Sequence, residues 1–353
     1  MTTLKAVAAR AEVSIATAGR VLRGDPTLVV RPATRARVMA AADELGYRPN
    51  RVASGLRTRR TGTIAVVLPD PQNLAWSETL RGIERGAADL GYVVVVADAH
   101  GPTLDPDQLA TFVLEGRMDG LLVAFATIVD ELVAQIVGRG LPLLPINSRS
   151  DMVDGSVTMD DATASRLAVA HLAELGHRRI AFLAGRSDTD VGRRREEGFR
   201  TAMADHGLPV EAAAVVAGDY TERTARDVAR SLLDQEPDRR PTAVFAVNLP
   251  SALGLRTAAR ALGLRIPDDL SLVTMDDHPF LEHTDPPLTA IQLPMEEMGT
   301  LGARMLIDAV AGAPIAHMVT STPPRLVVRQ STAYAFVGRD DRVAPVSAAQ
   351  GRT

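Results

Sequence analysis

A regular alternation of short apolar runs and amphipathic segments occupies most of the chain after residue 62. Strands are expected at 64–68, 92–97, 120–124, 141–146, 180–183, 243–246 and 271–275. Helices are expected at 78–90, 109–116, 130–138, 195–206, 224–233 and 250–262, with another beginning after Ser165. This alternation favours parallel sheets with helices on both faces. Two series of comparable length predict two similar lobes, with a cleft at the carboxyl ends of their strands.

Composition limits the size of the domains and the compartment. With 353 residues, 46% of them apolar, the chain is long enough for a small headpiece and one large or two medium domains. The lack of cysteine excludes disulfides and thiolate sites. Arg10 interrupts the apolar residues 6–11, and no segment approaches the roughly 18 apolar residues of a membrane helix. We therefore expect a soluble, cytoplasmic protein with no membrane partner.

The first 22 residues have a different pattern, with two short apolar-periodic helices expected at 4–11 and 14–22. The short turn between them is typical of a helix-turn-helix. Ser14 stands where an N-cap belongs on the second helix. The two faces of that helix carry Ile15, Ala16 and Arg20 on one side and Val13, Thr17 and Val21 on the other. One face could therefore pack while the other enters a groove of DNA.

The charge distribution agrees with a DNA-binding N-terminus. Residues 1–61 contain twelve Lys and Arg and four Asp and Glu, a net charge of about +8. The remaining 27 basic and 39 acidic residues leave 62–353 at about −12. A basic arm on an acidic body is expected when only one part of a chain meets phosphate. The alternative, a solvated arginine-rich surface helix such as 35–37, is disfavoured by the helix-turn-helix spacing beside it.

A third helix is expected within 27–47, opened by Pro32 and ended by Gly46. Its apolar stripe would cover the back of the first two helices. The following linker, 48–61, is basic and weakly amphipathic, with Val52, Ala53 and Leu56 on one face. A helix this short is unstable alone in water, so we expect it to form only against DNA or a second copy of the chain.

Several ordered motifs resemble the LacI/GalR family of repressors, from residue 3 to about 333. They are VSIATAGRVL (13–22), ELGYRPN (44–50), TGTI (61–64), HLAELGHRRI (171–180), PTAVFA (241–246), MDD (275–277) and PPLT (286–289). The resemblance implies an all-α helix-turn-helix headpiece and an α/β periplasmic-binding-protein-like body of two Rossmann-like lobes. It also implies that the chain crosses between the lobes three times, and we place these crossings near Asp161, Gln292 and Pro323.

The resulting domain prediction has four parts. The headpiece is 1–47, the hinge is 48–61, and the effector-binding and dimerisation body is 62–335. Its first lobe is expected at about 62–161 and 292–322, and its second at about 162–291 and 323–335. The tail, 336–353, lacks heptads for a tetramerising coiled coil and is expected to be disordered.

The resemblance also implies which residues meet DNA. Ile15 and Ala16 match the base-reading start of the recognition helix, Arg20 lies further along it, and Leu56 matches a leucine wedged into the minor groove. An arginine can donate twice to guanine, whereas Ile15 and Ala16 can only make apolar contacts, for instance with a thymine methyl. One helix reads too little sequence, so a homodimer on a palindromic operator is expected. The predicted DNA contacts are Ser14, Ile15, Ala16, Thr17, Arg20, Asn50, Ala53, Leu56 and Arg57.

Three headpiece positions, Ala6, Glu12 and Gly19, and one hinge position, Gly55, depart from the family pattern. Ala6 replaces a capping Asp, and Glu12 replaces a turn glycine at a place where positive φ is expected. Gly19 replaces a serine and lowers helix propensity by roughly 1 kcal/mol, while Gly55 loosens the hinge beside the wedge leucine. Ala6, Glu12 and Gly19 leave a second function open, a cytoplasmic solute-binding protein whose headpiece no longer reads DNA.

Candidate effector contacts follow the expected strands. The predicted set is Asn73, Trp76, Arg195, Tyr220, Asn248 and Asp276. A carboxylate, an amide and a guanidinium that converge on a cleft suit a polyol, so a sugar or sugar derivative is expected.

Several of these assignments have alternatives. Trp76 could stack on a ring or pack within its lobe, and Arg195 could be solvated charge. Asp160 could bind a ligand or cap a helix, with the cap slightly favoured. Leu249 follows Asn248 where the family has Asp, and Asn147 with Ser148 replaces a common Asp-Arg pair, so no relative's ligand can be copied.

No pattern indicates an enzyme, a metal site or a cofactor. The chain lacks a G-x-S-x-G elbow, a G-x-G-x-x-G after the first strand, and a phosphate-binding P-loop. His171 and His177 are six residues apart, the wrong spacing for metal ligands on one helical face, and His177 is expected to be structural. The sequence therefore predicts a DNA-binding transcriptional repressor whose operator affinity is controlled by a small-molecule effector in the cleft.

Overall fold

The computed structural model describes residues 2–22, 24–25, 27–47, 60–69, 73–99, 115–124, 130–210 and 214–335. The chain divides into two compact units, Met1–Gly62 and Thr63–Thr353, which are described separately below. Most of the hinge, the tail from 336 and most of the helix expected at 109–116 lie outside the described residues. No helix in the described ranges is both long enough and apolar enough to cross a membrane.

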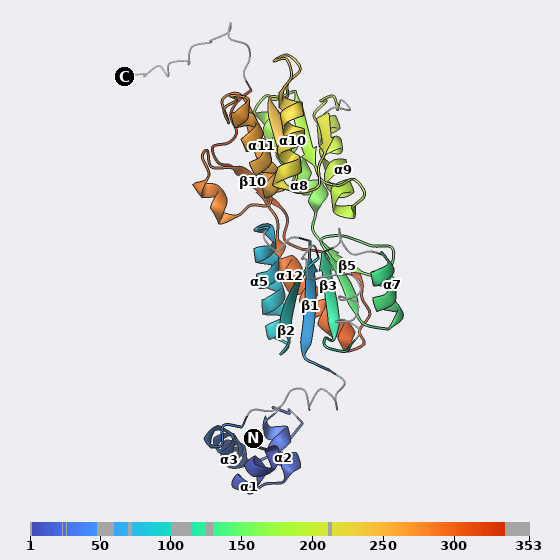
Figure 1. Cartoon of the computed structure of the whole chain (residues 1–353), viewed down its shortest axis with the longest axis vertical. Helices are drawn as coiled ribbons and strands as arrows, with labels where there is room; N and C mark the ends of the chain where they lie inside the picture. The colour runs from blue at the N-terminus through green and yellow to red at the C-terminus, as the bar shows by residue number, and fades with distance from the viewer. Residues whose placement is uncertain are drawn as a thin grey trace, which may run out of the picture. The chain divides into compact units, whose positions relative to one another are not determined.

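The described residues of the first unit form a headpiece of three helices, α1 (Leu4–Arg10), α2 (Ile15–Leu22) and α3 (Pro32–Glu44) (Figure 1). Its small core consists of Val7, Ala8, Ala11, Ala18, Val21, Val38, Ala41 and Ala42. The Ser14 hydroxyl accepts from the Thr17 N–H at 3.0 Å, so the predicted N-cap is confirmed. Glu12 has a φ of 54°, which confirms the strained turn that was expected there.

The body, which is the second unit, contains two six-stranded sheets, each the centre of one lobe (Figure 1). The first sheet has the order β11-β5-β4-β3-β1-β2 and is parallel throughout. Its strands are β1 (Thr63–Leu68), β2 (Val93–Asp98), β3 (Gly120–Ala124), β4 (Leu143–Ile146), β5 (Ser156–Thr158) and β11 (His317–Val319). Its helices are α5 (Ala75–Ala88), α7 (Asp130–Gly138) and α12 (Met295–Val310).

Alternating residues of β1 show how this sheet is buried on both faces. Ile64 and Val66 pack with Ile83 of α5 and Leu306 of α12, whereas Ala65 joins a separate cluster with α7. Helix α12 lies very close to α5. A Cβ atom added to Gly299 of α12 would stand only 2.1 Å from the carbonyl oxygen of Thr79 on α5. The alternation of side chains along each strand therefore gives every face of the sheet an apolar surface for a helix to cover.

The second sheet has the order β12-β10-β9-β8-β6-β7, and only β12 is antiparallel to its neighbour. Its strands are β6 (Ile180–Ala184), β7 (Val215–Ala217), β8 (Ala243–Ala246), β9 (Ser271–Met275), β10 (Thr289–Gln292) and β12 (Arg325–Val327). Its helices are α8 (Asp161–Glu174), α9 (Asp190–Asp205), α10 (Glu222–Leu233), α11 (Leu249–Ala261) and the 3₁₀ helix η2 (Pro279–His283).

Phenylalanines form the centre of one face of this sheet. Phe182 on β6 stacks on Phe199 of α9 at 5.2 Å and on Phe245 of β8 at 4.9 Å between ring centroids. All three side chains are fully buried, and burial of each contributes about 1.5–3 kcal/mol. Ala181 and Leu183, the β6 residues of opposite orientation, pack with α10 and α11 on the other face.

The chain passes between the sheets after β5, after β10 and after β11. These segments contain the positions near Asp161, Gln292 and Pro323 where crossings were expected. The predicted class, parallel sheets with helices on both faces beside a helical headpiece, is confirmed. The sequence analysis missed α12 and the short strands β5, β7, β10, β11 and β12.

Candidate functional site

Two parts of the molecule are candidate sites, and the first is the surface of α2. Ile15 is 48% exposed, and Ser14 and Ala16 are also exposed. Ala18 and Val21 are buried against the other headpiece helices. Thr17 is half-buried, and its hydroxyl lies 2.8 Å from that of Ser14. The α2 helix therefore presents its first turn to solvent and packs the opposite side.

Arg20 is the one long cationic side chain among the predicted contacts on α2, and it is not free. Its Nε donates to Asp25 at 2.7 Å and its Nη2 donates to Thr27 at 2.9 Å. The sequence analysis did not identify either partner. Among the other predicted DNA contacts, Asn50, Ala53, Leu56 and Arg57 lie outside the described residues, as does Gly55.

The second candidate site is a cavity of about 460 Å³ at the carboxyl ends of strands from both sheets of the body. All six predicted effector contacts line it: Asn73, Trp76, Arg195, Tyr220, Asn248 and Asp276. The lining further includes Asp98, Asn147, Arg186, Asp219, Thr221 and Met295, which the sequence analysis did not propose as contacts. The cavity therefore combines an apolar ring, several carboxylates and two guanidinium groups.

Arg195 occupies the buried floor of the cavity. Its side chain is 4% exposed; Nε donates to Asp161 at 2.7 Å and Nη1 donates to the Val247 carbonyl at 2.7 Å. Nη2 lies 3.9 Å from Asp276 Oδ1. Burial opposes the charged guanidinium, but the two carboxylates outweigh it and hold the pKa of Arg195 above its usual range. Arg195 is therefore a fixed cation rather than solvated surface charge.

Asp276 is the acidic counterpart of Arg195 in the cavity. Oδ1 is buried and has no hydrogen-bond partner in the described part of the chain. Burial raises the pKa of Asp276 to about 6, although Arg195 partly offsets this and the nearby Asp161 carboxylate adds to it. An unsatisfied buried carboxylate oxygen is costly, and a donor group on a ligand would remove that cost.

Three lining residues share an unusual backbone conformation. Asn147, Tyr220 and Asp276 have φ values of 64°, 72° and 67°. For side chains other than glycine this region is strained, and such strain clusters where a binding site needs a fixed side-chain direction. Asn147 Oδ1 is, like Asp276 Oδ1, buried without a partner among the described residues.

Tyr220 and Asn248 support each other at one side of the cavity. The Asn248 Nδ2 donates to the Tyr220 carbonyl at 2.9 Å, and its Oδ1 accepts from the Ser251 N–H as the cap of α11. The Tyr220 hydroxyl lies 3.0 Å from that of Thr189, and its ring covers Gly185 so closely that a Cβ there would stand 2.2 Å away. Asn248 thus already uses its amide to hold α11 and the backbone of Tyr220.

On the first lobe, Trp76 both lines the cavity and packs in the lobe core. Its side chain is 8% exposed and belongs to the cluster that includes Ile64 and Met298. Asn73 lies two residues before α5, and its Oδ1 accepts from the Ala75 N–H at 3.1 Å. The two interpretations of Trp76 left open by the sequence are therefore compatible.

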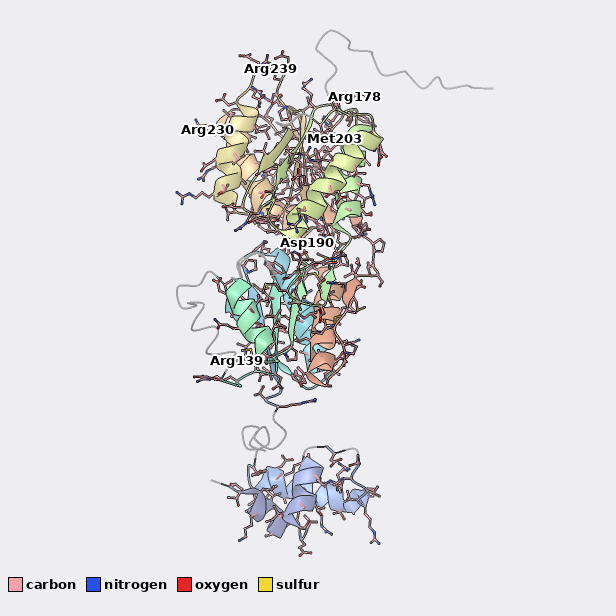
Figure 2. All side chains as sticks on the ribbon, turned by 90° about the vertical axis from the view of Figure 1, so that its right-hand side faces the viewer. Arg139, Arg178, Asp190, Met203, Arg230 and Arg239 are labelled. Atoms are coloured by element: carbon pink, nitrogen blue, oxygen red, sulfur yellow. The ribbon has the colours of Figure 1, made fainter. Side chains whose placement is uncertain are left out.

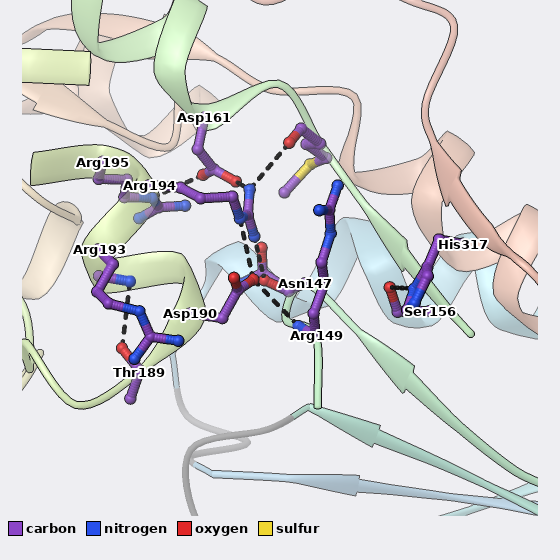
Figure 3. A network of polar contacts seen from close by, with 12 residues as sticks. Asn147, Arg149, Ser156, Asp161, Thr189, Asp190, Arg193, Arg194, Arg195 and His317 are labelled. Carbon is purple, nitrogen blue, oxygen red and sulfur yellow. Dashed lines mark hydrogen bonds and ion pairs between the residues drawn. The ribbon is translucent and has the colours of Figure 1, made fainter. Parts of the chain in front are cut away.

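Arg194, next to Arg195 on α9, joins the two lobes (Figure 3). It forms ion pairs with Asp161 and with Asp190, and it donates to the Asn147 carbonyl of the first lobe at 2.9 Å. Asp190, at the end of the second lobe that faces the first (Figure 2), also accepts from the Arg149 N–H at 3.0 Å. We call Arg194, Asp161, Asp190, Asn147 and Arg149 the interlobe network.

Asp160 and His177 both have structural roles. Asp160 caps α8, accepting from the Thr163 N–H at 3.0 Å, so the favoured cap is confirmed. His177 is buried, with Nδ1 2.9 Å from the Thr242 hydroxyl and Nε2 3.0 Å from that of Ser271. Burial lowers the pKa of His177, which keeps the ring neutral, and its expected structural role is confirmed.

Comparison with known proteins gives matches over both units. Residues 3–50 match bacterial regulatory proteins of the lacI family, and residues 169–332 match the periplasmic binding protein-like domain. Catabolite control protein A of Priestia megaterium is 32% identical over 332 residues, which span 94% of this chain and 99% of that protein. The chain belongs to the LacI family.

Two solved structures of regulators resemble this LacI-family chain along almost its full length. A complex of transcriptional regulator CelR with cellobiose has a TM-score of 0.71 at 31% identity and covers 94% of this chain and 100% of its own. A lac repressor dimer bound to operator and the anti-inducer ONPF has a TM-score of 0.77 at 28% identity, with coverages of 94% and 99%. The LacI-family chain is thus a DNA-binding transcriptional regulator, as the sequence predicted, and its relatives are regulators rather than enzymes.

Of four site residues of this LacI-family regulator that were not predicted from the sequence, two follow a recognisable pattern and two do not. Asp98 and Asp219 follow the same strand-end pattern that identified Asp276, so that signal was present. Asp161 and Arg194 had no such signal, because their roles depend on a carboxylate shared between two adjacent arginines. Asp161 is the buried residue, whereas its neighbour Asp160, which the sequence analysis weighed, is exposed.

Proposed function

We propose that this regulator represses transcription as a homodimer on a palindromic operator and that a sugar or sugar derivative in the interlobe cavity changes its operator affinity. The observation that carries the proposal is the pairing of buried Arg195 with the unsatisfied Asp276 in a cavity that Trp76 also lines. We place this activity in the cytoplasm, where the operator would be found.

The chemistry of the cavity supports a neutral polyhydroxyl ligand. A hydroxyl can donate to Asp276 Oδ1 and accept from Arg195 Nη2, which lies 3.9 Å away. The Trp76 and Tyr220 rings offer apolar surface for the carbon face of a sugar. A cavity of about 460 Å³ has the size expected of a small-molecule site. The CelR structure contains cellobiose, which is of this class.

The interlobe network supports coupling between ligand and lobe arrangement. The Asp161 carboxylate holds both Arg195, on the cavity floor, and Arg194, which donates to the Asn147 carbonyl of the first lobe. A ligand that contacts Arg195, Asp276 and Asn147 would favour one arrangement of the lobes over another. The response of DNA affinity is then a shift in populations that the ligand's differential contacts bias.

Dimer formation is supported by the relatives and by one edge of the first sheet. The lac repressor structure is a dimer on its operator. In this chain, edge strand β2 exposes Val93, Val95 and Val96 at 52%, 36% and 46%. Exposed valines on an edge strand favour pairing with a second surface, and a second copy would supply it.

The operator part of this proposal is tested by gel-shift titration of the full chain against DNA upstream of its own gene. We expect a specific complex that weakens steeply with salt and that Arg20→Ala weakens by about tenfold for each half-site while ligand binding remains. Arg10→Ala is the charge-matched control, because Arg10 is an exposed headpiece arginine paired with Glu44. It should lose only sequence-independent affinity.

Two outcomes of this titration would count against the proposal. If Arg20→Ala and Arg10→Ala lost the same affinity, α2 would not read the operator through Arg20. If no salt-sensitive specific complex formed at all, the alternative of a solute-binding protein with a degenerate headpiece would be favoured. Thermal shift of the full chain against a panel of sugars, nucleosides and their phosphates tests the ligand class.

A further inference from the structure

The end of α2 places Asp25 against Arg20. Gly24 has a φ of 67°, and its N–H donates to the Val21 carbonyl at 3.0 Å. The Asp25 N–H donates to the Arg20 carbonyl at 3.1 Å. Together these bonds form a Schellman motif, in which a glycine in the left-handed conformation ends a helix and turns the chain back. The backbone of Asp25 is therefore tied to that of Arg20.

The side chains of the same residues are joined as well. Arg20 Nε donates to Asp25 Oδ2 at 2.7 Å, and Nη2 donates to the Thr27 hydroxyl at 2.9 Å. The other carboxylate oxygen accepts from the N–H of Thr27 at 2.9 Å and from its hydroxyl at 2.7 Å. These hydrogen bonds, that from Arg20 above all, hold the pKa of Asp25 far below its usual range. Asp25 thus stays ionised and holds one edge of the guanidinium.

The Arg20 guanidinium has further N–H donors that do not bond to Asp25 or Thr27. A guanidinium has five N–H bonds, and Asp25 and Thr27 occupy one on Nε and one on Nη2. The end of the fork, formed by Nη1 and the second Nη2 hydrogen, has no partner among the described residues. Two parallel donors of this kind match O6 and N7 of guanine.

The location of Arg20 fits this use. Its side chain is 39% exposed, and it lies one helical turn after Ala16, which is exposed. A carboxylate close to the DNA-facing side of a helix would by itself repel phosphate. The pairing of Asp25 with Arg20 neutralises the carboxylate locally. The pair also holds the Arg20 side chain in one place.

We propose that Asp25 is a specificity-determining positioning residue, which with Thr27 fixes Arg20 so that the free end of its guanidinium reads one guanine in each operator half-site. This inference rests on the proposed function, in which α2 reads the operator. Fixing a long side chain before binding removes rotamer freedom that would otherwise be lost on the DNA. It also restricts the arginine to one base pair, so the effect is on sequence preference more than on affinity.

The test is selection of bound duplexes from DNA with a randomised centre, using the full-length wild type, Arg20→Ala, Asp25→Ala and Asp25→Asn. Base preferences of each variant are then measured on the wild-type consensus and its single-base-pair changes. We expect Arg20→Ala and Asp25→Ala to lose preference at the same base pair of each half-site, by about tenfold, and to keep it elsewhere. Asp25→Asn should keep part of the preference, because an amide oxygen can still accept from Nε.

A matched control separates positioning from stability. Glu44→Ala removes the carboxylate of the other headpiece ion pair, with Arg10, which is 58% and 56% exposed. It should leave every base preference unchanged. Thermal unfolding of all variants shows whether the headpiece remains folded, and loss of preference at every position together with a lower melting temperature would mean a purely structural role and contradict the inference.

Two further results would overturn the inference. If Asp25→Ala bound all sequences more tightly with unchanged preferences, Asp25 would be a competitor of DNA for Arg20 rather than its support. If Arg20→Ala kept all preferences, no arginine would be there to position. A wild-type chain that selects no sequence at all would instead contradict the proposed function itself, and with it this inference.

Discussion

Arg20 in the headpiece and Arg195 in the body are each held by carboxylates, but in opposite surroundings. The Arg20–Asp25 pair is 39% and 26% exposed, whereas Arg195 and Asp161 are 4% and 0% exposed. Exposed ion pairs contribute about 0–1 kcal/mol, while removal of one partner from a buried pair costs about 3–5 kcal/mol. The same carboxylate–guanidinium pair therefore orients a side chain at the surface of the headpiece, whereas in the body it stabilises buried charges on the cavity floor.

The largest expected effect on stability comes from removing Arg195, the cation of the buried ion pair. Arg195→Met leaves Asp161 and Asp276 without their shared cation, so we expect a loss of about 3–5 kcal/mol in unfolding free energy and no ligand-induced thermal shift. Urea denaturation of the full chain measures the loss. Arg193→Met is the control, because Arg193 lies on the same helix but is exposed; equal losses for both variants would contradict the contrast drawn here.

The next effect concerns the interlobe network. Arg194→Met removes charge-assisted hydrogen bonds to Asp161, Asp190 and the Asn147 carbonyl, and each such bond contributes about 1.5–3 kcal/mol. Arg194 does not line the cavity. We therefore expect the sugar to bind with changed affinity although no direct contact is lost, as measured by calorimetry. Unchanged ligand affinity together with an unchanged operator response would show that the network does not couple the lobes.

A smaller effect follows from the raised pKa of Asp276, at about 6. A ligand hydroxyl that donates to Asp276 needs the carboxylate ionised, so affinity should be constant above pH 7 and fall as the pH drops through 6, by up to tenfold per unit. The stability of the ligand-free chain should move the other way. Folding raises the pKa of Asp276. The contribution of Asp276 to the unfolding free energy therefore grows as the pH falls from above 6 towards the ordinary pKa of an aspartate.

Calorimetric titration of the sugar at several pH values, with wild type and Asp276→Asn, checks this prediction. The variant cannot titrate at this position, so its affinity should be weak and independent of pH in that range. A wild-type affinity that rises on acidification would mean that the ligand accepts a hydrogen bond from protonated Asp276 instead of donating one to the carboxylate.

The smallest effect lies in the headpiece, at Glu12. Its φ of 54° costs a residue other than glycine about 1–2 kcal/mol. Glycine would relieve this strain, but its greater conformational freedom in the unfolded chain offsets part of the gain. Glu12→Gly should therefore stabilise the headpiece by about 1 kcal/mol or less. Hydrogen exchange of α1 and α2 amides in the full chain measures it, and faster exchange in the variant would show that Glu12 makes a stabilising contact.

The comparison also explains what the sequence could and could not reveal. Headpiece features are local: Ser14 caps the helix that follows it, and Glu12 occupies a turn position that a family motif marks. The six candidate effector contacts were found because strand ends carry the polar residues of an open α/β sheet. Roles that need two distant segments, such as Arg194 bonding to the Asn147 carbonyl, left no pattern in the sequence.

The missed contact of Arg20 shows the same limit at short range. Arg20 and Asp25 are five residues apart, too far for a helical pair, and they meet only because Gly24 reverses the chain. The strands β10, β11 and β12 were missed for another reason. β11 and β12 have only three residues each, too few for a periodic signal, and for all three strands the neighbours in the sheets supply the pairing that defines them.

Operator affinity measured with and without a stabilising sugar shows whether a ligand in the cavity controls DNA binding. The wild type should change its affinity by about 5–150-fold at saturating sugar, and the operator should change sugar affinity by the same factor. Asp276→Asn should bind the operator normally and not respond. A wild type whose operator affinity is identical with and without bound sugar would show that the cavity does not control DNA binding.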